Sequence, residues 1–248
     1  MKFFIYLIFL ANLSASTVNL NYVGELSLFG KVADATIYYF NDGKNYHIKV
    51  TGTGSGIIAK LTNNKHYVYE SIGRVKNLEL IPLKYITSEI NSDMNKSKTY
   101  IFDYKNSITT VESTKVERVD KSKFNIFTFK YDKKEKIVET KKRKVINKIF
   151  KDDMVSVFFN KRNKLLEMRE KESKTIFAVG SKDMENGIVV SLKSSKDGKY
   201  IYTIHIKKDY LDNGSEEAKF VLNSNNILCE TSLNGILFFG NAVIKRVN

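Results

Sequence analysis

The chain has 248 residues, a formal charge of +14 and 42% hydrophobic residues. This length allows one large domain, or two small ones, with a buried core. Cys229 is the single cysteine, so an intramolecular disulfide is excluded. Its apolar neighbours Ile227 and Leu228 predict a small buried residue rather than a reactive thiol.

The first residues have the three parts of a secretory signal peptide. Met1-Lys2 is basic, residues 3–13 are an apolar run, and Ser14-Ala15-Ser16 supplies small residues for cleavage after Ser16. The apolar run is shorter than the roughly 18 residues of a membrane span, and no cysteine follows it to carry a lipid anchor. We therefore expect a signal peptide over 1–16 and a periplasmic or secreted protein. Export separates the chain from nucleic acid, so its basic charge does not predict a nucleic-acid partner.

Most of the mature chain, 17–248, shows the two-residue alternation of half-buried strands. The clearest case is Lys199–Lys207, where Tyr and Ile alternate with Thr, His and Lys. Asn41-Asp42-Gly43 and Lys196-Asp197-Gly198 separate such runs and predict hairpins. We expect a single, mainly β domain built on a large antiparallel curved sheet or open barrel, with one or two short helices.

One helix is predicted to begin at Phe150 and to extend to Leu165-Leu166. Apolar residues recur at helical spacing, and Asp152-Asp153 stands at its start, where acids stabilise a helix amino terminus. Adjacent side chains on a helix point in different directions, so this pair is expected to cap the helix rather than to share acid–base catalysis. The run 155–159, Val-Ser-Val-Phe-Phe, is also compatible with a strand.

No motif specifies a reaction. Gly52-Thr53-Gly54-Ser55-Gly56 lacks the third glycine of a dinucleotide fingerprint, the ending of a P-loop and the spacing of a nucleophile elbow, so it predicts a bend. His47, His66 and His205 are widely separated and form no ligand pair. The sequence therefore predicts no catalytic residue, no metal site and no cofactor.

Two surface features are candidate sites. Lys141-Lys142-Arg143-Lys144 is the densest basic run in the charge-rich stretch 133–148. Its candidate partners are anionic lipid headgroups, lipopolysaccharide phosphates or an acidic protein face; the alternative is a charged edge strand that prevents aggregation. Asn95 stands in Asp93-Met94-Asn95-Lys96-Ser97, which has the form of an extended bacterial N-glycosylation acceptor. Chance matches are common in a chain rich in Asn and Ser.

Short segments spread along the chain carry a family resemblance. They are Tyr22-Val23-Gly24, the run 29–35 from Phe29 to Ala35, Thr51-Gly52-Thr53-Gly54, Gly73 with Leu80-Ile81-Pro82-Leu83-Lys84-Tyr85, Phe102-Asp103-Tyr104, the run 153–159 with its Asp-x-x-Ser, and Phe238-Phe239-Gly240. In this order they resemble domain-of-unknown-function family 3108, an exported bacterial family. Many members have proline where this chain has Met154. The family has no established activity; the resemblance implies an exported antiparallel β fold, related to the open half-barrels of periplasmic lipoprotein carriers.

Three classes of function stay open. Alternating aromatic residues on a curved sheet can enclose an apolar cavity, or can simply fill a core. We expect a non-catalytic domain that binds an apolar or amphipathic ligand, or a lipid, protein or anionic membrane partner at the cell envelope. The first alternative is a hydrolase-type enzyme with a site assembled from scattered residues. The second is an outer-membrane β-barrel, against which the charged middle segment argues. The sequence does not predict the oligomeric state.

Overall fold

The computed structural model describes residues 16–120, 123–125, 130–132, 135–180, 184, 187–207, 215–236 and 240–247. The expected signal peptide, apart from Ser16, lies outside these residues, as do Phe238-Phe239 of the family resemblance. In the part of the chain so described, no helix has the length and hydropathy needed to cross a membrane.

The described residues form a 14-stranded antiparallel sheet that is not closed. One half is a meander of β1 (Ser16–Leu26), β2 (Gly30–Asn41), β3 (Asn45–Gly54), β4 (His66–Lys76), β5 (Glu79–Ile90), β6 (Met94–Asp103), β7 (Ile108–Asp120) and β10 (Glu135–Ile146). The other half consists of β11 (Ser173–Ile176), β12 (Ile188–Lys196), β13 (Lys199–Lys207), β14 (Ser215–Asn223), β15 (Leu228–Ile236) and β16 (Gly240–Arg246). β16 pairs with β1 and joins the halves, which leaves β10 and β11 as the two edges. The expected mainly β, antiparallel open sheet is confirmed.

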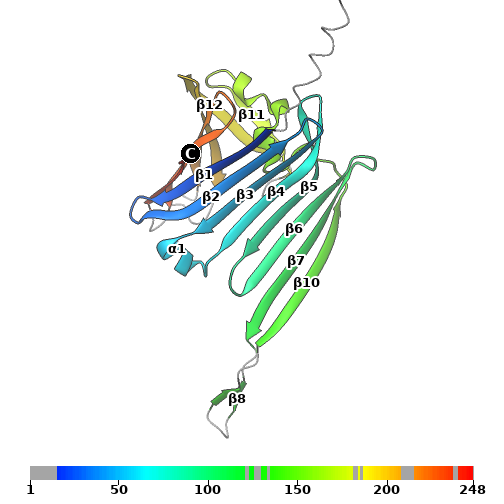
Figure 1. Ribbon diagram of the computed structural model, residues 1–248, viewed down its shortest axis with the longest axis vertical. Coiled ribbons are helices and arrows are strands. Elements are labelled where there is room, and N and C mark those ends of the chain that lie inside the picture. The colour runs from blue at the N-terminus through cyan, green and yellow to red at the C-terminus, as the bar shows by residue number, and fades with distance from the viewer. Residues whose placement is uncertain are drawn as a thin grey trace, which may run out of the picture.

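A short hairpin of β8 (Lys123–Asn125) and β9 (Lys130–Asp132) extends beyond the ends of β7 and β10 (Figure 1). The sheet bends so that β12 lies behind β1 in this view. The predicted hairpin turns are present: Asp42 Oδ1 accepts the backbone N–H of Lys44 and of Asn45. Asp197 and Gly198 take φ values of 51° and 70° between β12 and β13, as a tight two-residue turn requires.

The glycine-rich segment bends the chain as predicted. β3 ends at Gly54, Gly56 has a φ of 57°, and the short helix α1 (Gly56–Leu61) follows. Glycine suits position 56, because a residue without a side chain adopts a positive φ at little cost.

Residues 147–172, here called the crossing segment, connect the edge strand β10 to the opposite edge strand β11. The segment contains α2 (Ser156–Phe159) and two 3-10 turns, η1 (Lys161–Asn163) and η2 (Leu165–Glu167). The prediction of one continuous helix from Phe150 to Leu166 is therefore wrong. Asn160 is extended (ψ 116°) and Lys164 is left-handed (φ 50°), and both interrupt the helix.

The break at Asn160 has a tertiary cause. Its side-chain amide donates to the carbonyl of Leu80 at 2.9 Å and its oxygen accepts the N–H of Leu80 at 3.2 Å. An amide that is paired with the backbone of β5 in this way holds the residue out of helical geometry. Long-range hydrogen bonds thus override the helical spacing of the apolar residues.

The crossing segment packs on one face of the sheet, here called the inner face, and the opposite side is the outer face. Its first part, with Phe150 and Val155, joins a buried cluster under β1–β6 that includes Tyr22, Ile48 and Tyr85. Its later part, with Val157 and Leu165, joins a second cluster under β12–β14. The segment therefore fills much of the concave side that an open sheet would expose.

Candidate ligand-binding pocket

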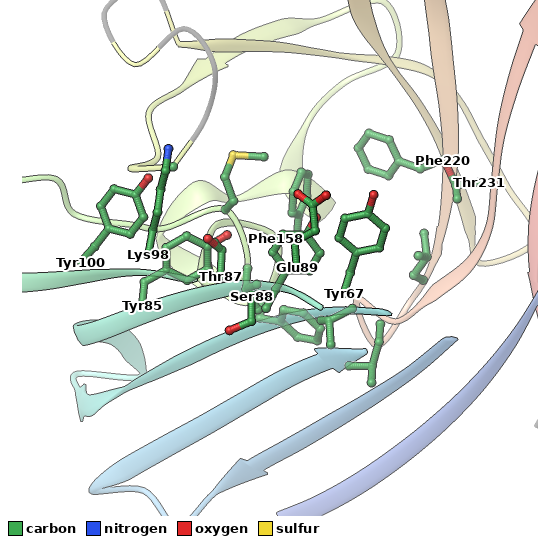
Figure 2. Close-up of a pocket in the computed structure, with 18 of the residues that line it drawn as sticks. Tyr67, Tyr85, Thr87, Ser88, Glu89, Lys98, Tyr100, Phe158, Phe220 and Thr231 are labelled. Atoms are coloured by element: carbon green, nitrogen blue, oxygen red, sulfur yellow. The ribbon is translucent and has the colours of Figure 1, made fainter. Parts of the chain in front are cut away.

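The crossing segment leaves part of the inner face uncovered, and a cavity of about 670 Å³ lies there. Its walls come from β2–β6, from the crossing segment and from β13–β15. Figure 2 shows Tyr67, Tyr85 and Lys98 standing on the same side of the sheet, with Phe220 on the far wall. Pockets that hold small ligands have volumes of about 300–1,000 Å³ and mainly apolar walls, so this cavity is large enough for one.

Aromatic rings dominate the near wall. Tyr67 and Tyr69 stack with ring centroids 6.5 Å apart and an interplanar angle of 7°. They keep 37% and 38% of their surface exposed, although Tyr85 in the next strand is buried. Val50 and Gly52 of β3 share this inner face with them in the strand register, and an added Cβ at Gly52 would meet nothing within 4 Å. The small neighbour leaves space beside the exposed rings.

The far wall is apolar and tightly packed. Phe220 stacks on Tyr202 with centroids 5.0 Å apart and meets Phe158 of α2 edge-on. Asn226 Nδ2 donates to the carbonyl of Phe158 at 2.6 Å, which ties the β14–β15 turn to the crossing segment. Because these contacts tie β13, β14 and the crossing segment together, the cavity has a preformed wall opposite Tyr67.

Charged groups gather at one end of the cavity, along β5 and β6. Glu89, Lys96 and Lys98 line it there. Glu89 forms an ion pair with Lys65 at 2.7 Å, and this bond raises the pKa of the Lys65 ammonium group. Burial raises the pKa of the Tyr69 and Tyr100 phenols, so these rings are neutral at physiological pH.

A buried polar network lies beneath the pocket. Asp153 accepts the hydroxyl proton of Ser71 at 2.6 Å, and Ser71 contacts the hydroxyl of Tyr46 at 3.0 Å. The other carboxylate oxygen of Asp153 accepts the N–H groups of Val155 and Ser156, each at 2.8 Å. Burial raises the pKa of Asp153 to about 6. Ser71 and Asp153 are both fully buried, so the network holds the crossing segment on β4 and offers no group to a substrate.

Asp152 has separate partners. Its carboxylate accepts the side-chain amides of Asn160 at 2.7 Å and Asn163 at 3.2 Å, and burial raises its pKa. Asp153 caps the backbone N–H groups at the start of α2, as predicted, whereas Asp152 binds the turn after it. The two adjacent carboxylates have no hydrogen-bond partner in common among the described residues.

The basic run and the candidate glycosylation site both lie on strands. Lys141, Lys142, Arg143 and Lys144 are all exposed on the edge strand β10. Asn95 is exposed on β6, paired with Ile90 of β5 and Val116 of β7. Alternation along β6 places Asn95 on the outer face, because Lys96 lines the pocket.

The remaining candidates do not converge. His47 Nε2 lies 2.6 Å from Glu70 Oε1, His66 Nδ1 lies 2.7 Å from Thr53 Oγ1, and His205 is exposed on β13. Within the described ranges, no three His, Cys, Asp or Glu side chains group as metal ligands. Cys229 is partly buried, with Sγ 3.7 Å from the carbonyl of Ile227.

The residues that line the pocket were not identified as a site from the sequence. Tyr67, Tyr69 and Lys98 stand in ordinary alternating strands, so their pattern is the same as that of core tyrosines and surface lysines. No family model, no curated protein and no solved structure matches the chain. The resemblance to domain-of-unknown-function family 3108 therefore stays a prediction.

Proposed function

We propose that the chain is an exported, non-catalytic domain that binds an apolar or amphipathic ligand in the pocket at the cell envelope. The observation that carries this proposal is the uncovered aromatic wall at Tyr67 and Tyr69, facing Phe220 across a cavity of about 670 Å³. An apolar surface that folding leaves exposed inside a concavity is stabilised by a ligand that buries it.

Two further observations support a binding role. The polar groups beneath the pocket, including Ser71 and Asp153, are fully buried and paired with one another, as expected of a scaffold. The walls come from segments far apart in the chain, and the crossing segment is fixed to β4 and β5 by hydrogen bonds. A preorganised cavity of this kind needs little ordering when a ligand enters.

The binding test uses the uncharged fluorophore N-phenyl-1-naphthylamine with the purified mature protein. We expect saturable fluorescence enhancement that Thr87→Phe abolishes, because Thr87 lines the pocket between Tyr69 and Lys98 in the strand register. Thr99→Phe, on the outer face of β6, is the matched control and should bind like the wild type. Equal binding by the two variants, or no enhancement by the wild type, would overturn the proposal.

Export is tested separately. Amino-terminal sequencing of protein from the periplasm or medium should begin at Thr17. β1 begins at Ser16, so this cleavage removes one strand residue whose neighbour in the sheet is Asn41. Protein that retains Met1 and fractionates with membranes would contradict export by a cleaved signal peptide. Native mass spectrometry of the exported protein then identifies any co-purified lipid.

A further inference from the structure

We infer that the pocket prefers a single-chain amphiphile with an anionic head, whose apolar chain lies in the cavity and whose head is held by inner-face lysines of β6 and β10. The inference rests on the proposed function and adds a ligand class to it. It follows from the way the sheet divides the basic residues between its two faces.

The strand register places one set of lysines on the pocket side. Lys98 lines the pocket and stands opposite Ser113 of β7, which in turn stands opposite Lys142 of β10. Tyr100, which also lines the pocket, stands opposite Val111 of β7, and Val111 stands opposite Lys144 of β10. Directly opposed residues of antiparallel strands point to the same face, and two strand spacings span about 10 Å.

The packing of neighbouring residues supports this assignment. Val111 of β7 and Ile146 of β10 pack against the buried cluster under β1–β6. Both side chains therefore lie on the inner face of the sheet. Ile146, Lys144 and Lys142 are alternate residues of β10 and share that face. Lys141 and Arg143 therefore lie on the outer face.

The two faces differ in charge compensation. On the outer face, Lys141 pairs with Glu139 at 3.0 Å and Arg143 with Glu112 at 3.8 Å. On the inner face, no described carboxylate lies within ion-pair distance of Lys98, Lys142 or Lys144. The pocket carboxylate Glu89 is already paired with Lys65. Lys98, Lys142 and Lys144 are thus uncompensated, whereas Lys115 on the same face of β7 pairs with Glu117.

This asymmetry distinguishes ligand recognition from edge protection. A charged edge strand prevents aggregation with charges on either face, so edge protection does not explain why, within the run 141–144, the ion-paired residues lie on the outer face and the unpaired ones on the pocket side. An anionic head at this end would meet several ammonium groups while its chain follows the aromatic wall. A neutral head would gain no such interaction.

The experiment compares head groups at constant chain length. Dodecanoate, dodecyl phosphate and dodecan-1-ol compete with N-phenyl-1-naphthylamine for the wild type and two charge-matched variants. The inner variant is Lys98→Gln/Lys142→Gln/Lys144→Gln. The outer variant is Lys84→Gln/Lys141→Gln/Arg143→Gln, in which Lys84 is an exposed outer-face residue of β5.

We expect the wild type and the outer variant to bind both anionic amphiphiles at least about tenfold more tightly than the alcohol, since each exposed ion pair contributes up to about fivefold. The inner variant should lose this preference and bind the two anionic amphiphiles no more tightly than dodecan-1-ol. Thermal midpoints equal to those of the wild type and the outer variant show that it is folded. High salt should reduce the preference of the wild type.

Three results would overturn the inference. Equal wild-type affinity for dodecanoate and dodecan-1-ol would show that the protein does not select an anionic head group, although the ligand still binds in the pocket. Equal losses in the inner and outer variants would mean that overall charge, not the inner lysines, is responsible. Competition by inorganic phosphate beyond the effect of matched ionic strength would indicate a free-anion site. Failure of the wild type to bind fluorophore or amphiphile would instead refute the proposed function.

Discussion

The hydroxyl of Ser71 donates a 2.6 Å hydrogen bond to the carboxylate of Asp153, although 82 positions separate the two residues. Both are fully buried. Ser71 belongs to the centre of β4, and Asp153 lies in the crossing segment three residues before α2. This contact therefore joins the inner face of the sheet to the segment that forms one wall of the pocket.

Replacement of Asp153 tests how much this junction stabilises the fold. Asp153→Ala leaves the backbone N–H groups of Val155 and Ser156 without the acceptor that they have now. Buried donors without a partner cost about 1–3 kcal/mol each, so we expect a loss of about 3–5 kcal/mol in the free energy of unfolding. Urea denaturation measures it.

Asp153→Asn is the conservative control. Its amide oxygen can still accept both N–H groups, and its amide nitrogen can donate to Ser71. We expect a loss of about 1 kcal/mol at pH 7, well below that of the alanine variant. Equal losses in the two variants would show that the hydrogen bonds to Asp153 are not what stabilises the junction.

The same carboxyl predicts a pH dependence of stability. Burial raises the folded-state pKa of Asp153 from 3.8 to about 6, so between these values the folded chain holds a proton that the unfolded chain has lost. This group's contribution is fully present below about pH 4 and is lost as the pH rises through about 6.

The measurement is the difference in unfolding free energy between the wild type and Asp153→Asn. Relative to the variant, the wild type should lose on the order of 2 kcal/mol from pH 4 to pH 7. Asp42 and Asp103, whose hydrogen bonds lower their pKa, have the opposite pH dependence and cancel in this difference. A flat difference, or one of opposite sign, contradicts the assignment.

Two glycines of neighbouring strands give a matched pair for packing. A Cβ at Gly73 would lie 2.1 Å from the carbonyl oxygen of Ile81 and 2.6 Å from Cε1 of Tyr46. Gly73→Ala should therefore destabilise the protein by about 3 kcal/mol, since backbone atoms must move. Gly52→Ala, where a Cβ meets nothing within 4 Å, should change stability by less than about 1 kcal/mol. Thermal melts of the two variants make the comparison, and similar midpoints would contradict it.

The strands could be predicted from the sequence because their alternation is local. Lys199–Lys207 is a strand as expected, and an open antiparallel sheet follows from many such runs with tight turns. The helix from Phe150 was predicted wrongly because its apolar spacing is also local, whereas the hydrogen bonds of Asn160 to Leu80 join residues 80 positions apart. No local pattern reports such a contact.

The pocket was beyond sequence-based prediction for a related reason. Tyr69 and Tyr85 have the same residue type and the same strand pattern, yet Tyr69 is 38% exposed and Tyr85 is 1% exposed. The difference depends on where the crossing segment lies over the inner face. Alternation alone places Lys142 and Lys144 on one face of a strand and Lys141 and Arg143 on the other. Only the register of β10, β7 and β6 shows which of these faces lies on the pocket side.

The basic run also occupies the edge strand β10, whose free side has no partner strand among the described residues. Charged residues on such an edge discourage pairing with a second chain. Replacement of Lys141, Lys142, Arg143 and Lys144 by Gln should leave the thermal midpoint nearly unchanged, since exposed charges contribute about 0–1 kcal/mol per pair.

Replacement of the four by Thr-Val-Thr-Val keeps strand propensity and removes the charges, so we expect concentration-dependent self-association through β10. Light scattering at several protein concentrations measures this, with the wild type, which keeps the charges, as control. If the Thr-Val variant stays as monodisperse as the wild type at every concentration, the charges of β10 are not needed to protect the edge, and ligand recognition by Lys142 and Lys144 is left as their role.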